Sequence, residues 1–290
     1  MAITLRDETA GVITIGDLQV RRLGFGAMRL TGEGVWGEPD EPEEARRVLR
    51  RAVELGVNFI DTADAYGPDV NERLIAEALH PYPDDLVIAT KGGLERTGPG
   101  QWPRNGRPEH LRQACEGSLR RLRLDVIDLY QLHAPDPQVP FDESVGALKE
   151  LRDEGWIRYV GVSNVDLEQL ATAEQIVKIA SVQNRFNLTD RGSEPVLRAC
   201  EGEGIAFIPW FPLATGDLTD DGGPLEEVAR KHSATTAQVA LAWLLSASPV
   251  TLPIPGTSSV AHLEEDVAAA GLTLDGDDMV VLNRLGVRRG

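Results

Sequence analysis

Short apolar segments alternate with amphipathic segments along most of this 290-residue chain, and the alternation restricts the folds open to it. The amphipathic segments have helical spacing, and the apolar segments have the length of strands and are bounded by turn residues. Strands that alternate with helices predict a parallel sheet. Strands are expected at residues 23–28, 59–61, 86–90, 126–132, 159–162, 181–183, 206–209 and 251–254.

The number of these units predicts how the sheet is arranged. Eight strand and helix units in about 250 residues predict a closed (β/α)8 TIM barrel of the α/β class. No low-complexity linker divides the chain, so we expect a single domain over residues 1–290. An open, doubly wound sheet is the alternative, although residues 24–29 lack the third glycine of its usual Gly-x-Gly-x-x-Gly turn. Helices are expected at residues 42–55, 71–79, 108–122, 141–154, 167–173, 194–203, 236–245 and 261–270.

The segment before the first barrel strand has a different pattern. Residues 12–20 alternate in polarity and carry Gly16 and Asp17 at their centre, which predicts a β-hairpin that turns there. We expect this hairpin to cap the bottom of the barrel, where the ring of helices leaves an opening.

Composition excludes some partners. The formal charge of -17 disfavours nucleic acid and anionic membranes. No apolar run reaches the ~18 residues of a membrane span, and residues 1–11 lack the apolar core of a signal peptide. Cys115 and Cys200 both fall in helical patterns and are expected to be small buried residues. A reducing, cytoplasmic location is therefore expected.

Four ionisable residues stand at or just after the ends of three consecutive strands. Asp61 ends the second strand, Tyr66 follows it, and Lys91 and His133 end the third and fourth strands. In a barrel these side chains would converge on one rim, where active sites lie. Taken singly, each has a structural explanation as a turn, packing or surface residue. Together, at neighbouring strand ends, they are hard to explain by packing alone.

The same four residues make a consistent chemical set. A tyrosine has a reference pKa of about 10, and an ammonium beside it favours the phenolate and lowers that pKa. A carboxylate such as Asp61 would hold Lys91 charged, and His133 could orient a substrate oxygen. The set supplies the proton donor and oxyanion site needed when a hydride attacks a carbonyl carbon.

Two other classes of function remain alternatives. One is a barrel that binds a nucleotide cofactor without catalysis, although such a protein would not need the proton donor. The other is a metal-dependent hydrolase or isomerase, which would need clustered ligands. The five histidines stand far apart in the sequence and only His133 ends a strand, so no metal site is expected.

Six short motifs follow one another along the chain: residues 58–67 (Asn-Phe-Ile-Asp-Thr-Ala-Asp-Ala-Tyr-Gly), 89–93 (Ala-Thr-Lys-Gly-Gly), 128–133 (Asp-Leu-Tyr-Gln-Leu-His), 161–164 (Gly-Val-Ser-Asn), 182–184 (Val-Gln-Asn) and 252–256 (Leu-Pro-Ile-Pro-Gly). In these motifs the chain resembles the aldo-keto reductases, from about Arg22 to Ala270. The resemblance implies reduction of aldehydes or ketones to alcohols with a nicotinamide cofactor. It implies that Tyr66 is the general acid, that Lys91 tunes it, that Asp61 pairs with Lys91, and that His133 polarises the carbonyl.

The resemblance also implies a set of cofactor residues. Ser163, Asn164 and Gln183 would bind the nicotinamide carboxamide, and Trp210 stands where the family usually has a tyrosine stacked on the ring. Phe211 replaces a common serine, so one hydroxyl contact to the pyrophosphate is lost. The remaining expected contacts come from the loops after the seventh and eighth strands and from the last helix: Pro212, Leu213, Gly216, Ile254, Gly256, Thr257, Ser258, His262, Glu265 and Asp266.

Cofactor preference and substrate are less constrained. Relatives that select NADPH strongly place a lysine and an arginine after strand eight, where this chain has Gly256 and His262, so we expect only a modest preference over NADH. Trp36 and Trp102 are candidates for an aromatic wall around a small carbonyl substrate, and each could equally anchor a loop. The chain ends at Gly290 soon after its last expected helix, residues 261–270, which predicts an open, permissive pocket. A monomer is favoured.

Overall fold

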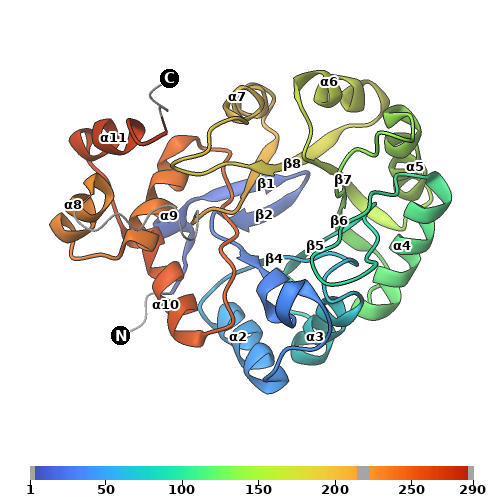
Figure 1. The fold of residues 1–290 in the computed structure, drawn as a ribbon, viewed down its shortest axis with the longest axis horizontal. Coiled ribbons are helices and arrows are strands. Elements are labelled where there is room, and N and C mark those ends of the chain that lie inside the picture. The colour runs from blue at the N-terminus through green and yellow to red at the C-terminus, as the bar shows by residue number, and fades with distance from the viewer. Residues whose placement is uncertain (1–3, 214–222, 287–290) are drawn as a thin grey trace.

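A computed structural model describes residues 4–213 and 223–286 of the chain. Its central sheet has seven parallel strands that pair in chain order, from β3 to β9. Figure 1 shows the strands at the centre with helices around them, and the hairpin of β1 and β2 crossing behind. The prediction of an α/β barrel is thereby confirmed. The strands are β3 (Phe25–Gly26), β4 (Phe59–Asp61), β5 (Val87–Gly92), β6 (Ile127–Leu132), β7 (Ile157–Ser163), β8 (Ile179–Arg185) and β9 (Ala206–Trp210).

The helices form because each has one apolar face and a suitable start. In α2, for example, a proline occupies the first turn, and Ala45, Val48, Leu49 and Ala52 recur at helical spacing and are buried. The helices are α1 (Asp7–Ala10), α2 (Pro42–Glu54), α3 (Val70–Leu79), α4 (Pro108–Leu122), α5 (Phe141–Asp153), α6 (Leu167–Ile176), α7 (Glu194–Glu203), α8 (Pro224–Lys231), α9 (Thr236–Ala247), α10 (Val260–Ala268) and α11 (Gly276–Asn283), with 3-10 turns η1 (Ala27–Leu30), η2 (Glu33–Val35) and η3 (Ala269–Gly271).

The eighth expected strand, residues 251–254, is not a regular strand. Pro253 and Pro255 have no N–H, so the segment cannot complete a ladder. It nevertheless occupies the eighth position, because it is hydrogen-bonded to β9 on one side and to the first barrel strand on the other. The four bonds are Phe207 N to Val250 O at 2.8 Å, Leu252 N to Phe207 O at 2.8 Å, Gly24 N to Pro253 O at 2.9 Å and Gly26 N to Pro255 O at 3.0 Å.

The expected hairpin is confirmed as β1 (Val12–Ile15) paired with β2 (Leu18–Arg21). Its buried residues pack against the first residues of the barrel strands, and this cluster fills the barrel interior. The hairpin turn is fixed to β7, since the backbone N–H of Asp17 donates to the Tyr159 hydroxyl at 3.0 Å. The barrel is therefore closed below, and its open end lies at the carboxyl ends of the strands.

Three helices were not expected from the sequence: α1, α8 and α11. The other boundaries agree with the expected ranges to within a few residues. In the described ranges, no helix is long and apolar enough to cross a membrane.

Candidate active site

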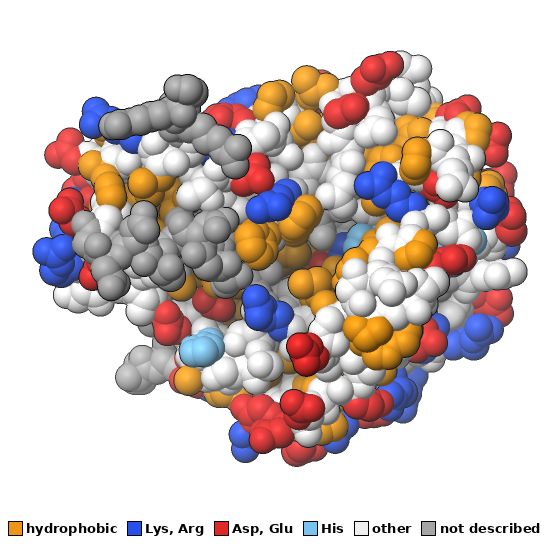
Figure 2. Space-filling model, viewed as in Figure 1, with side chains coloured by type: hydrophobic (Ala, Val, Ile, Leu, Met, Phe, Trp, Pro, Cys, Tyr) orange, Lys and Arg blue, Asp and Glu red, His pale blue; other side chains and the backbone are white. Residues whose placement is uncertain are grey.

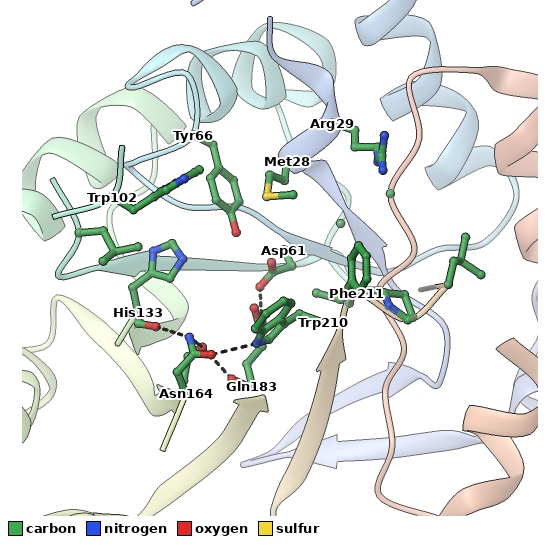
Figure 3. Close-up of a pocket in the computed structure, with 17 residues that line it drawn as sticks. Met28, Arg29, Asp61, Tyr66, Trp102, His133, Asn164, Gln183, Trp210 and Phe211 are labelled. Atoms are coloured by element: carbon green, nitrogen blue, oxygen red, sulfur yellow. Dashed lines mark hydrogen bonds between the residues drawn. The ribbon is translucent and has the colours of Figure 1, made fainter. Parts of the chain in front are cut away.

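A cavity of about 430 Å³ opens at the carboxyl ends of the strands. Figure 2 shows this face hollowed near its centre, with hydrophobic side chains around the hollow. Its lining is mostly apolar and comes from strand ends all around the barrel, as Figure 3 shows. The sequence-predicted residues that line it are Asp61, Tyr66, Trp102, His133, Ser163, Asn164, Gln183, Trp210, Phe211, Pro212, Leu213, Ile254 and Gly256.

The floor of the cavity holds a buried ion pair. The Lys91 Nζ donates to Asp61 Oδ2 at 2.6 Å, to the carbonyl of Thr62 at 2.8 Å and to the Tyr66 hydroxyl at 3.4 Å. Lys91 is completely buried. The pairing of β4 with β5 brings these groups together, since Asp61 lies opposite Ala89 and Lys91 projects two residues further on. A carboxylate, an ammonium and a phenol thus form one chain.

A second layer of hydrogen bonds holds the carboxylate in place. Gln183 Nε2 donates to Asp61 Oδ1 at 2.8 Å, and Gln131 Nε2 lies 3.4 Å from the same oxygen. All three residues are buried. The orientation of Asp61 is therefore set by β6 and β8 as well as by Lys91. Gln131 was not anticipated from the sequence as a site residue.

The protonation of the phenol differs from the expectation. Burial raises the pKa of Tyr66 above its ordinary value, while the Lys91 ammonium opposes that rise. The lowering effect expected of Lys91 is present, but desolvation of the phenolate outweighs it. Burial alone would lower the pKa of Lys91, yet Asp61 and Tyr66 together raise it. The phenol is neutral and the ammonium charged at neutral pH.

His133 lies beside the phenol. Its ring centroid is 5.8 Å from that of Tyr66, in an edge-to-face arrangement. Burial, with the charges of Lys91 and Arg96, holds the pKa of His133 well below its usual range. The imidazole is therefore neutral, and one of its nitrogens carries a proton that can be donated. Its Nδ1 is buried and has no hydrogen-bond partner in the described part of the chain.

Asn164 connects the two sides of the cavity. It adopts a left-handed backbone conformation with φ of 59°, and its Nδ2 donates to the His133 carbonyl at 3.0 Å and to Ser163 Oγ at 3.0 Å. The Trp210 Nε1 donates to Asn164 Oδ1 at 3.1 Å. The indole thus fixes which way the amide points, as Figure 3 shows.

The loop after β9 forms the wall beyond Trp210. Phe211 has φ of 58°, which is unusual for a bulky residue. The guanidinium of Arg185 lies 5.7 Å from the Trp210 ring and 5.1 Å from the Phe211 ring. Gly216 lies outside the described residues.

The segment before α10 lies against the last residue of β3. A Cβ added at Gly256 would lie 2.4 Å from the Gly26 carbonyl oxygen, so only glycine permits this approach. Thr257 Oγ1 accepts from Ser259 N at 3.1 Å, and Ser259 Oγ caps α10 by accepting from His262 N at 3.5 Å.

Several predicted cofactor residues lie outside the cavity. Thr257, Ser258 and His262 are at the start of α10 and do not line it in the described structure. Glu265 accepts a hydrogen bond from Thr235 Oγ1 at 2.6 Å, at the N-terminus of α9. Asp266 is buried, which raises its pKa to about 7.

The two candidate substrate-side tryptophans differ in position. Trp102 lines the cavity and meets the Tyr66 ring edge to face at 6.3 Å. Trp36 is not among the described lining residues and instead forms a bridge with Gly67. Four lining residues were missed: Gly26, Met28, Arg29 and Leu94. Their signal was available, because they end or closely follow the first and third barrel strands.

Comparison with known proteins gives a consistent result. Residues 22–286 match the model of the Aldo/keto reductase family. The chain is 50% identical over 277 residues to an uncharacterized oxidoreductase of Schizosaccharomyces pombe, covering 96% of this chain and 90% of that protein. It is 42% identical over 282 residues to pyridoxine 4-dehydrogenase of Escherichia coli, covering 95% and 98%. An aldo/keto reductase of Klebsiella pneumoniae, solved with NADP and acetate, superposes with a TM-score of 0.81 at 28% identity, covering 96% of each chain.

Proposed function

This chain belongs to the aldo/keto reductase family, and from that membership and the geometry of its cavity we propose that it reduces aldehydes or ketones to alcohols with NADPH. The observation that carries the proposal is the buried chain from Asp61 through Lys91 to Tyr66 at the cavity floor. A protein that only bound a nucleotide would have no use for a protonated phenol supported by a buried ion pair.

The cavity fits a nicotinamide cofactor. Trp210 offers an aromatic face, and Asn164 and Gln183 line the same space with amide groups suited to a carboxamide. The amides, hydroxyls and N-terminus of α10 suit a phosphate. We assign the carboxamide to Ser163, Asn164 and Gln183, and the 2′-phosphate to the segment from Thr257 to His262. NADPH supplies the hydride when it is bound.

The residues of the chain supply the rest of the reaction. The carbonyl oxygen accepts hydrogen bonds from the Tyr66 hydroxyl and from neutral His133, which polarise the carbonyl. As the carbon gains the hydride, negative charge develops on the oxygen and the Tyr66 proton moves to it. The phenolate that remains is stabilised by Lys91, which Asp61 keeps charged. The raised pKa of Tyr66 keeps the phenol protonated at neutral pH, so the proton is present to be donated.

The apolar lining supports a flat, apolar substrate. Met28, Leu94 and Trp102 line the cavity together with Tyr66 and His133. Figure 3 shows Met28 and Trp102 beside the Tyr66 ring. The name of the Escherichia coli relative, pyridoxine 4-dehydrogenase, adds pyridine aldehydes to the candidates. We place aromatic and heteroaromatic aldehydes ahead of sugars.

The direct test is a panel of aromatic, aliphatic and sugar aldehydes, with pyridoxal included, followed by the absorbance of NADPH. We expect NADPH oxidation with the aromatic aldehydes and weaker turnover with sugars. NADPH that binds but is not oxidised by any member of the panel would favour the non-catalytic alternative.

The preference for NADPH over NADH is expected to be modest. At the start of α10 the hydroxyls and helix dipole favour an anion, but the exposed His262 stands where a guanidinium would give a bidentate contact. The change His262→Arg should therefore widen the ratio of kcat/KM between NADPH and NADH, by about tenfold for ~1.4 kcal/mol. An unchanged ratio would show that this position does not meet the 2′-phosphate.

A further inference from the structure

Arg96, on the loop after β5, has all five of its N–H donors within hydrogen-bond distance of backbone carbonyls. The acceptors belong to three different loops, which follow β3, β4 and β5. None of these described acceptors is a side chain of the hydrogen-bonded series Asp61, Lys91 and Tyr66. The bonds are Nε to Gln101 O at 2.9 Å, Nη1 to Val35 O at 2.7 Å, Nη1 to Ala65 O at 2.8 Å, Nη2 to Gly34 O at 2.9 Å and Nη2 to Gly98 O at 3.4 Å.

The same guanidinium lies against both candidate substrate-side tryptophans. It is 3.7 Å from the centroid of the Trp102 ring and 5.5 Å from that of Trp36. Trp102 in turn meets the Tyr66 ring edge to face, and Ala65, whose carbonyl Arg96 holds, directly precedes Tyr66. Arg96 itself does not line the cavity in the described structure. One residue therefore lies between Arg96 and Tyr66 in each of two directions: Trp102 in one and Ala65 in the other.

The backbone that Arg96 holds is strained. Val35 has φ of 55°, a left-handed conformation that a β-branched residue rarely adopts. Its carbonyl accepts from Arg96 and also from Gly67 N at 3.3 Å. Such a conformation persists only where the surroundings fix it, and it is typical of functional sites. The strain at Val35 indicates that the exact course of this loop matters.

We propose that Arg96 is a positioning residue that joins the three loops into one substrate-side wall and so fixes Trp102 relative to the Tyr66 hydroxyl. The inference rests on the proposed carbonyl reduction. Arg96 acts through Trp102 and through the backbone before Tyr66, and it contacts neither substrate nor cofactor. Trp36, which is not among the described lining residues of the cavity, is the second aromatic ring beside the guanidinium.

A guanidinium is specifically suited to this role. Its planar fork can serve five acceptors while its faces lie on aromatic rings, whereas an ammonium has three donors and no face. The Arg96 charge also contributes to the low pKa of His133, behind burial and Lys91. Arg96→Lys keeps this charge and removes the planar fork, so it isolates the contribution of the fork.

The test compares Arg96→Lys with a matched control, Arg104→Lys. Arg104 lies on the same loop and, within the described residues, its side chain donates to one carbonyl, that of Pro135, at 3.0 Å. Amide hydrogen exchange is measured on peptides that cover residues 33–37 and 98–102. Steady-state kinetics are measured with an aromatic aldehyde and NADPH. We expect faster exchange in both peptides only in Arg96→Lys. We also expect a KM for the aldehyde raised about tenfold, with an unchanged Kd for NADPH.

A second variant covers the case in which Arg96→Lys does not fold. Trp36→Leu removes one of the two aromatic rings beside the guanidinium, at a position outside the described cavity lining, and it should raise the KM for the aldehyde in the same direction. Unchanged exchange in Arg96→Lys, or an unchanged KM in Trp36→Leu, would overturn the proposal. Hydrogen exchange can be measured without turnover. If the wild type is inactive and exchange is faster only in Arg96→Lys, the proposed function is refuted, but the inference that Arg96 joins the three loops is not.

Discussion

Lys91 is a buried ammonium, and its surroundings explain how the chain tolerates it. An isolated charge in the protein interior would cost several kcal/mol. Here Asp61 supplies the opposite charge at 2.6 Å, and the Thr62 carbonyl and Tyr66 hydroxyl satisfy the remaining donors. A pair of this kind contributes little net stability, but it holds a charge at a defined distance from the phenol. The arrangement is therefore better explained by catalysis than by stability.

The indole of Trp210 is predicted to act in two separable ways. Trp210→Ala should weaken NADPH binding by about 1–2 kcal/mol, which is roughly 5–30-fold in Kd, because the stacking face is lost. Trp210→Phe keeps an aromatic face but loses the Nε1 donor that orients Asn164. It should show a smaller loss. Tryptophan fluorescence quenching on NADPH addition measures both, and an unchanged Kd in Trp210→Ala would place this residue outside the cofactor site.

Single residues at strand ends could be read from the sequence, but their protonation could not. Asp61, Tyr66, Lys91 and His133 do meet at one rim, because parallel strands bring their ends together. The net pKa of Tyr66 depends on how completely the cavity floor excludes water, and no local pattern reveals that. The position of Trp36 is a second feature that the sequence did not reveal. Its position after a strand did not show that its ring lies beside Arg96 and outside the cavity lining of the described structure.

Among the elements, α10 carries a buried acid whose raised pKa predicts that stability depends on pH. Burial raises the pKa of Asp266 from 3.8 to about 7. A raised folded-state pKa means that the protonated acid is favoured in the fold, so stability is greatest below about pH 4 for this group and is lost as pH rises through 7. The cost above pH 7 is on the order of 4 kcal/mol for a shift of this size.

The change Asp266→Asn removes this cost. Its free energy of unfolding should exceed that of the wild type by more at pH 8 than at pH 5, in the absence of cofactor. Denaturant titration at the two pH values measures the difference, and Asp40→Asn, at an exposed position before α2, is the control. A gain that does not grow with pH would mean that Asp266 ionises freely in the fold.

The eighth barrel element shows where element prediction fails. Its apolar run has the length of a strand, yet prolines at 253 and 255 remove the donors that a ladder requires. The sequence pattern indicated the position of the segment correctly, whereas its hydrogen bonds depend on which carbonyls face β3 and β9. The helices α8 and α11 were missed because they are short and lie outside the repeating strand and helix units.

Contacts between segments that are distant in the sequence close the barrel, and Arg22 makes several of these contacts. Its Nε donates to Thr251 O at 3.2 Å, and its Nη2 donates to Leu245 O at 2.8 Å, to Ser248 O at 2.5 Å and to Thr251 Oγ1 at 3.0 Å. These bonds connect the start of the barrel to the end of α9 and to residues 251–254, which occupy the eighth barrel position.

Arg22→Met should therefore lower the free energy of unfolding by about 2–4 kcal/mol, because partly buried carbonyls lose their donors. Arg47→Met is the matched control. Arg47 is exposed on α2 and pairs only with Glu44 among the described side chains, so its loss should cost less than about 1 kcal/mol. Equal effects in the two variants would show that Arg22 does not secure the closure.

The central claim is that the Tyr66 hydroxyl delivers the proton to the carbonyl oxygen. The most direct test is the kcat of Tyr66→Phe beside its Kd for NADPH, since the change removes one oxygen and leaves the ring that packs against Trp102 and His133. We predict a fall in kcat of about 10²–10⁴-fold with an unchanged Kd for NADPH. A variant that keeps most of its kcat would contradict the account, because the buried chain from Asp61 to Tyr66 would then not supply the proton.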